Sequence, residues 1–172
     1  MSEAGPQPFR LELRAGAREG LYEGPFGPLR AGFDERGALV RGDGLDARLD
    51  WAPLETGERR WKTENERLRA GVPATVNGRG YVLRRPGSGW GRGGSALVLE
   101  EDGVERVRVR KRRLSTLSAE RPGGEVVARC TSGSRGKVWP RAEPGDVALL
   151  VLLVVNLDLH LGSTTAGPPI LP

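Results

Sequence analysis

The chain has 172 residues, of which 37% are hydrophobic, and it contains 26 glycines and 13 prolines. This length allows one domain with a real core, and the glycine and proline content excludes a helical bundle in favour of short strands joined by turns. The net charge of +5 is spread evenly, with 15 basic against 13 acidic residues in 1–86 and 12 against 9 in 87–172, which excludes a basic arm or an acidic tail.

Cysteine usage and the first residues bear on the compartment. Cys130 is the only cysteine, so an internal disulfide is excluded. The segment MSEAGPQ is acidic and contains proline, unlike a secretory signal peptide. We therefore expect a cytoplasmic protein, free or peripheral at a membrane, with a disordered N-terminus over 1–7, a single β-rich domain over 8–162 and a flexible tail over 163–172.

The first fifty residues show the alternation of apolar and polar side chains that is typical of strands. In residues 9–14, Phe9, Leu11 and Leu13 share one face of a predicted half-buried strand. Turn-forming residues at 34–37 and 42–44 predict two hairpins. The other extended segments expected here are short pieces of 21–33, then 38–40 and 45–51.

The middle of the chain contains the weakest and the strongest local signals. Residues 53–57 predict a loop. Residues 60–69 have a composition that suits a helix, but Trp61 and Leu68 make a poor apolar stripe, so we expect an exposed strand. The Asn77-Gly78 pair, between apolar runs at 74–76 and 81–83, strongly predicts a hairpin.

Further turns divide residues 87–139 into short strands. A glycine-rich loop at 87–94 leads into 96–99, and the turn at 101–103 leads into 104–109. Two more strands are expected at 125–130 and 136–139. The chain thus predicts a mainly β fold of ten to twelve short antiparallel strands, in a barrel or a sandwich, around one C-terminal hydrophobic helix.

Residues 147–161, VALLVLLVVNLDLHL, form the one strongly apolar segment. Asp146 is placed as an N-cap, and Gly162 as a C-terminal cap. A helix of this length spans roughly 22 Å, short of the roughly 30 Å hydrocarbon core of a bilayer. We expect a central core helix over 146–161. A tail anchor and a buried strand are the alternatives, the latter because valine-rich runs favour strands.

Few residues suit catalysis or metal binding. His160 is the only histidine, and we expect it to be structural. Cys130 lies in RCTSGSRG, which is similar to a phosphate-binding cysteine loop, but Arg135 follows one residue too early for the phosphatase pattern. One cysteine and one histidine cannot form a zinc site. A hydrolase or phosphatase using Cys130 or His160 is the least favoured hypothesis, and we predict no catalytic residue, cofactor or metal.

The strongest functional candidate is the basic run RVRVRKRR, residues 106–113. In a strand, its alternate arginines project from one face about 6.6–7 Å apart. Such a row suits anionic lipid headgroups, as in phosphatidylserine or a phosphoinositide, and nucleic acid is less favoured. The alternative is a solvated face whose arginines pair with Glu100, Glu101 and Glu105. The predicted headgroup-binding residues are Arg84, Arg85, Arg106, Arg108, Arg110, Lys111, Arg112 and Arg113.

The end of the chain resembles a known fold. In PGDVALLVLLVVNLD, residues 144–158, one acidic residue opens an all-round hydrophobic helix and another closes it, and the turns at 34–37 and 101–103 echo a D-x-x-G pattern. Many strands before one such helix resemble the tubby-like superfamily, which includes the LURP-one-related proteins and the phospholipid scramblases. The resemblance implies a closed twelve-stranded barrel around the helix. For function, it implies only phosphoinositide or membrane-surface binding, with no matched binding residue.

Two non-enzymatic hypotheses therefore lead. The first is a β-barrel module that binds anionic headgroups through the arginine-rich strand. The second is a scaffold that binds a protein partner without a small ligand. Its interface anchors would be whichever of the four tryptophans are exposed, namely Trp51, Trp61, Trp90 or Trp139.

Overall fold

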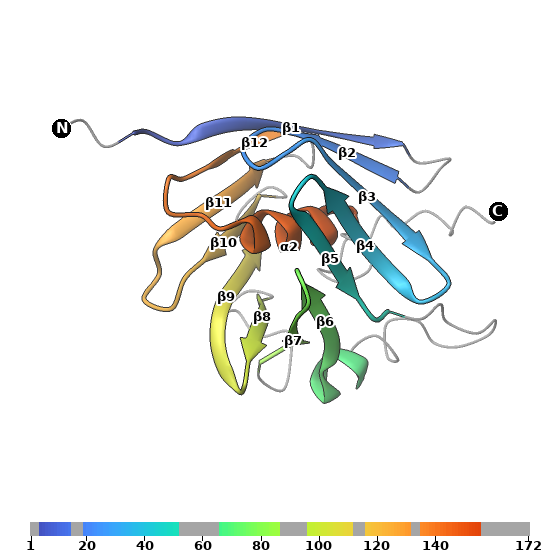
Figure 1. Cartoon of the computed structure of the whole chain (residues 1–172). Coiled ribbons are helices and arrows are strands. Elements are labelled where there is room, and N and C mark those ends of the chain that lie inside the picture. Colours follow the sequence, from blue (N-terminus) through green and yellow to red (C-terminus); the bar gives the residue numbers. More distant parts are fainter. Residues whose placement is uncertain are drawn as a thin grey trace.

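A computed structural model of the protein describes residues 4–14, 19–51, 66–86, 96–111, 116–131 and 135–155. These residues form twelve strands that close into one antiparallel barrel, with a helix inside it (Figure 1). The elements are β1 (Gln7–Arg14), β2 (Glu19–Glu23), β3 (Leu29–Asp34), β4 (Gly37–Gly42), β5 (Leu45–Leu49), β6 (Val72–Val76), β7 (Arg79–Arg84), β8 (Ala96–Glu101), β9 (Val104–Lys111), β10 (Leu117–Glu120), β11 (Val126–Thr131), β12 (Arg135–Val138) and α2 (Pro144–Val155).

The topology is the simplest that a barrel allows. Each strand pairs with its neighbours in sequence, and β1 pairs with β12 to close the sheet. The predicted hairpins at Asn77-Gly78 and at residues 101–103 are confirmed: Asn77, Gly78, Asp102 and Gly103 all have positive φ, between 50° and 80°. Two consecutive residues of that kind form the turn whose twist matches the flanking strands. The predicted barrel of ten to twelve strands is therefore confirmed, and the sandwich is excluded.

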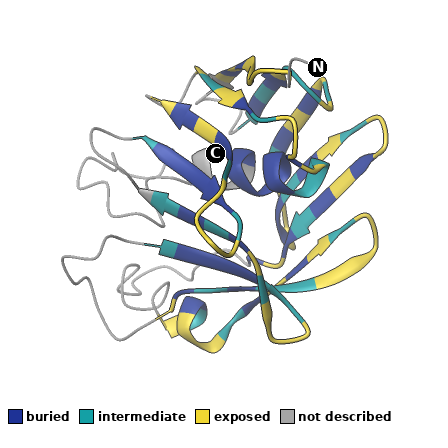
Figure 2. Cartoon of the chain, turned by 90° about the vertical axis from the view of Figure 1, so that its left-hand side faces the viewer, coloured by how far each residue is buried: buried dark blue, intermediate teal, exposed yellow. Residues whose placement is uncertain are grey.

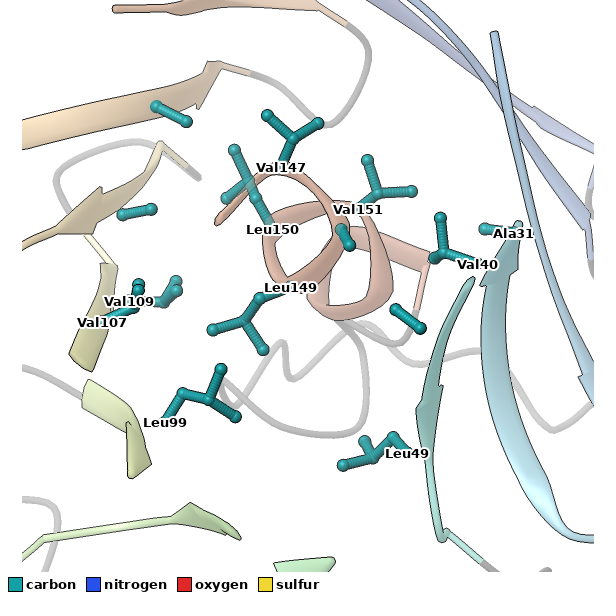
Figure 3. Close-up of a cluster of buried hydrophobic side chains, with 14 of the residues drawn as sticks. Ala31, Val40, Leu49, Leu99, Val107, Val109, Val147, Leu149, Leu150 and Val151 are labelled. Atoms are coloured by element: carbon teal, nitrogen blue, oxygen red, sulfur yellow. The ribbon is translucent and has the colours of Figure 1, made fainter. Parts of the chain in front are cut away.

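Helix α2 fills the barrel. All five residues from Val147 to Val151 are at most 4% exposed, so this part of the helix is buried on every side (Figure 2). Side chains from β3, β4, β5, β8 and β9 lie around it (Figure 3). The strand alternative for this segment is therefore wrong over 144–155. Among the described residues, no helix is long and apolar enough to cross a membrane.

Small side chains on the inner face make room for the helix. A helix with its side chains is about 10–12 Å across, so the strands around it cannot all carry large inward residues. The buried alanines of the strands are Ala31, Ala38, Ala47, Ala74, Ala119 and Ala128.

The start of α2 differs from the prediction. Pro144 is the first helical residue, where its fixed φ suits the helix and its missing N–H costs nothing. The Asp146 carboxylate accepts a hydrogen bond from the backbone N–H of Glu143 at 2.8 Å. This contact is the back-reaching half of a capping box. Glu143 therefore occupies the N-cap position, and Asp146 is the third residue of the helix.

Two secondary-structure predictions were wrong. Residues 66–70 are helical and not an exposed strand. Gly71, with φ of 99°, ends this short helix. Because the helix has little more than one turn, the fully buried Leu68 is enough to pack it against the barrel, whereas a longer helix would need a stripe of apolar residues. Strand β10 was missed because it has only four residues, LSAE, with one large apolar side chain.

Several predictions lie outside the described residues. These are the loops at 53–57 and 87–94, the part of the exposed-strand prediction over 60–65, the helix end over 156–161, the cap Gly162 and the tail at 163–172. Gln7, predicted to belong to a disordered N-terminus, is the first residue of β1.

Candidate functional site

The predicted arginine row lies on β9. Val107 and Val109 are buried and point towards α2, so Arg108 and Arg110, which alternate with them, point outward. Arg106 is the extra residue of a bulge, because the register with β8 passes from Val107 to Glu105, and it lines a cavity together with Val107. The shared face that the strand pattern predicted is therefore present for Arg108 and Arg110, and the bulge removes Arg106 from it.

Each of these arginines has a carboxylate beside it. Arg106 Nε donates to Glu101 at 3.0 Å, and Arg108 donates two hydrogen bonds of 2.8 Å to Glu105. That bidentate contact lowers the pKa of Glu105 and raises that of Arg108. Arg110 Nε lies 3.3 Å from a carboxylate oxygen of Glu120, a residue only 4% exposed. The positive charge of the row is therefore largely compensated.

The other predicted binding residues do not form one cluster with the row. Arg84 pairs with Glu100 at 3.3 Å and donates to the carbonyls of Arg69 and Ala70, so it fastens the short helix at 66–70 to β7. Arg85 is buried, and its backbone N–H donates to the carbonyl of Leu68. The Lys111 side chain, Arg112 and Arg113 lie outside the described residues.

A second basic surface lies on the outer face of β11 and β12. In the sheet register Arg129 stands directly opposite Lys137, and Thr131 directly opposite Arg135. Trp139 follows two residues after Lys137. These residues and Pro6 line a groove of about 420 Å³, here called the β11–β12 groove. Its lining is Pro6, Arg129, Thr131, Arg135, Gly136, Lys137 and Trp139.

The cations of this groove differ from those of β9. Arg129 Nε donates to the buried Ser118 hydroxyl at 3.1 Å, and its guanidinium carbon lies 5.7 Å from the centre of the Trp139 ring. Arg135 and Lys137 are exposed, and neither makes an ion pair within the part of the chain that the structure describes. Among the residues that the structure describes, no acidic side chain lines the groove. Its three positive charges therefore face solvent uncompensated.

The sheet register places like charges together here. Arg129 faces Lys137 across β11 and β12, and Arg10 faces Arg135 across β1 and β12. Like charges directly opposite each other destabilise a sheet. Gly136 holds these strands close together, because a Cβ there would come within 2.4 Å of the Phe9 ring. The barrel thus tolerates a local electrostatic cost at this position.

Sequence reasoning missed this surface, although a signal was present. Arg135, Lys137 and Trp139 alternate along the chain, which is the interleaving of basic and aromatic residues expected of an anion-binding strand. In the sequence, Arg135 was considered only as the arginine of a phosphatase loop, which its spacing from Cys130 does not fit. Trp139 was considered only as an anchor for a protein interface. The contribution of Arg129 needs the strand register, which no local pattern provides.

The structure describes some of the remaining candidates, which are the cysteine, the histidine and the four tryptophans. Cys130 is buried and faces the core opposite Gly136, whereas Arg135 points outward, so these two side chains cannot surround one phosphate. Trp51 is buried and lies under Arg67, so it is no interface anchor. Trp139 is half-buried in the groove. Trp61, Trp90 and His160 lie outside the described residues.

Comparison of the chain with protein-family models, with curated proteins and with solved structures finds no match. The twelve-stranded antiparallel barrel is compatible with a barrel superfamily, but none of these comparisons identifies which one. Any functional argument therefore rests on this chain's own residues.

Proposed function

We propose that the protein is a non-enzymatic β-barrel module that binds anionic lipid headgroups at a membrane surface, with the β11–β12 groove as its main contact. The observation that carries this proposal is a groove with three cations and a tryptophan, whose described lining contains no carboxylate. The resemblance to the tubby-like superfamily agrees with it by analogy only. A cytoplasmic, peripheral location is part of the same proposal.

The charges and the aromatic residue suit a membrane surface. Each lysine or arginine near an anionic membrane contributes about 1 kcal/mol, so Arg129, Arg135 and Lys137 together supply about 3 kcal/mol. Tryptophan is favoured at the level of the headgroups, because its ring is apolar and its N–H is polar. The β9 arginines would add less, since binding an anion there competes with Glu101, Glu105 and Glu120.

Vesicle flotation of the full-length protein tests the proposal. We expect flotation on vesicles containing phosphatidylserine, none on phosphatidylcholine alone, and weaker flotation as salt rises. The Arg135→Gln/Lys137→Gln variant should lose most of this binding with an unchanged melting temperature, because both side chains are exposed. Equal flotation on neutral and anionic vesicles, or full binding by that variant, would refute the proposal. Binding of single-stranded RNA without vesicle binding would replace it with a nucleic-acid function.

A further inference from the structure

A separate cavity of about 230 Å³ opens at the end of the barrel where α2 begins. Its apolar lining consists of Val76, Leu99, Val107 and the ring of Tyr81, and the first turn of α2 adds Gly145 and Asp146. It shares no lining residue with the β11–β12 groove. The cavity therefore places charged groups, which make up most of its exposed lining, next to a smaller apolar area, away from the β11–β12 groove.

The charges in the cavity are divided between two sides. On one side, a single carboxylate, Glu101, lies between Arg79 and Arg106 and bonds both, which leaves a net charge of +1. On the other side, Arg121 pairs with Asp146 at 2.8 Å and lies 3.6 Å from Glu143, which leaves a net charge of −1. The cavity is thus bipolar although its total charge is zero.

Hydrogen-bonding capacity remains on both sides. Arg106 donates to Glu101 through Nε, and its side chain is 51% exposed. Within the described part of the chain, its two terminal nitrogens can therefore still donate hydrogen bonds to a ligand. Glu143 is 76% exposed and only loosely paired.

We propose that this cavity binds a small apolar zwitterion of the α-amino acid class. Its carboxylate would lie against Arg79 and Arg106, its ammonium group against Glu143, and its aliphatic side chain on Val76, Leu99 and Val107. The volume is below the roughly 300 Å³ at which drug-sized ligand pockets begin, which favours a small ligand of this size.

Three related probes test the charge pattern with the full-length protein. L-leucine carries both charges, N-acetyl-L-leucine only the negative one and L-leucinamide only the positive one. By ligand-observed NMR and calorimetry, we expect L-leucine to bind, and each derivative to bind at least about tenfold more weakly, as expected for losing one charge-assisted contact. No binding of L-leucine at about 10 mM, or equal binding of the three probes, would overturn the proposal.

Variants locate the binding within the molecule. Arg106→Gln and Glu143→Gln should each weaken L-leucine binding at least about tenfold without unfolding the protein, because both side chains are exposed. Arg30→Gln is the matched control: it removes an exposed, ion-paired arginine on β3, away from the cavity, and should leave the affinity unchanged. Binding that survives both cavity variants would place the ligand elsewhere and contradict the proposal.

Discussion

The buried ion pair between Arg121 and Asp146 should be the most sensitive polar contact of the barrel. Asp146 is 2% exposed, and Oδ2 accepts both Arg121 Nη2 and the Glu143 N–H at 2.8 Å. Replacing Arg121 by Met keeps most of the aliphatic part of the side chain but leaves a buried carboxylate without its counter-ion. Breaking a buried pair in this way costs about 3–5 kcal/mol. We expect about 3 kcal/mol, because the hydrogen bond from Glu143 remains.

The pH dependence of this loss follows from the direction of the pKa shift. Burial raises the pKa of Asp146 above its ordinary value, against the opposing effects of the Glu143 hydrogen bond and the Arg121 charge. Without Arg121 the pKa rises further, so the folded variant binds a proton that the unfolded chain has released. Its stability therefore falls as pH rises from the unfolded value of about 3.9 through the raised folded value. The cost of Arg121→Met should be largest near pH 7 and smallest near pH 4.

Urea unfolding at both pH values measures this cost, provided that the m-value is unchanged. Arg141→Met is the matched control, because the Arg141–Glu125 pair is 73% and 48% exposed, and breaking such a pair costs about 0–1 kcal/mol. A loss below about 1 kcal/mol for Arg121→Met at pH 7, or a loss that does not change with pH, would refute the reasoning.

Three further predictions concern the core and the groove. Leu150→Ala should lower the free energy of unfolding by about 2–5 kcal/mol, since Leu150 lies inside the barrel at 1% exposure, and a smaller loss in chemical unfolding would contradict a packed central helix. Gly136→Ala should cost at least about 1–3 kcal/mol, because its Cβ would meet the Phe9 ring and the Arg129 carbonyl, whereas Gly32→Ala has open space and should be tolerated. Neutralising Lys137 with Gln should leave stability unchanged or slightly increase it, because the like-charge contact with Arg129 disappears.

The parts of the fold that were predictable depend on local signals. The turns at 77–78 and 102–103 require residues that tolerate positive φ, and the chain has Asn-Gly and Asp-Gly there. The central helix was predictable because an all-round apolar segment must be buried. The start of α2 was misplaced by two residues, because proline can either end a helix or occupy its first position. Pro144 occupies the first position.

The candidate site was less predictable because it depends on register between strands. A row of arginines is visible in the sequence, but the compensation of Arg110 by Glu120 requires β9 and β10 to pair, and β10 was not predicted. The β11–β12 groove likewise forms only when Arg129 is brought opposite Lys137. The sequence therefore shows which strands carry basic side chains. Whether carboxylates lie beside those side chains depends on how the strands pair in the folded sheet.

The most direct test of the central claim compares two sets of substitutions on one barrel. Vesicle partition coefficients are measured for Arg135→Gln/Lys137→Gln and for the β9 triple variant Arg106→Gln/Arg108→Gln/Arg110→Gln, on vesicles containing phosphatidylserine. The account predicts a larger loss from the two groove substitutions than from the three on β9, although they remove less charge. A loss that follows the number of charges removed, or falls mainly on the β9 variant, would contradict it.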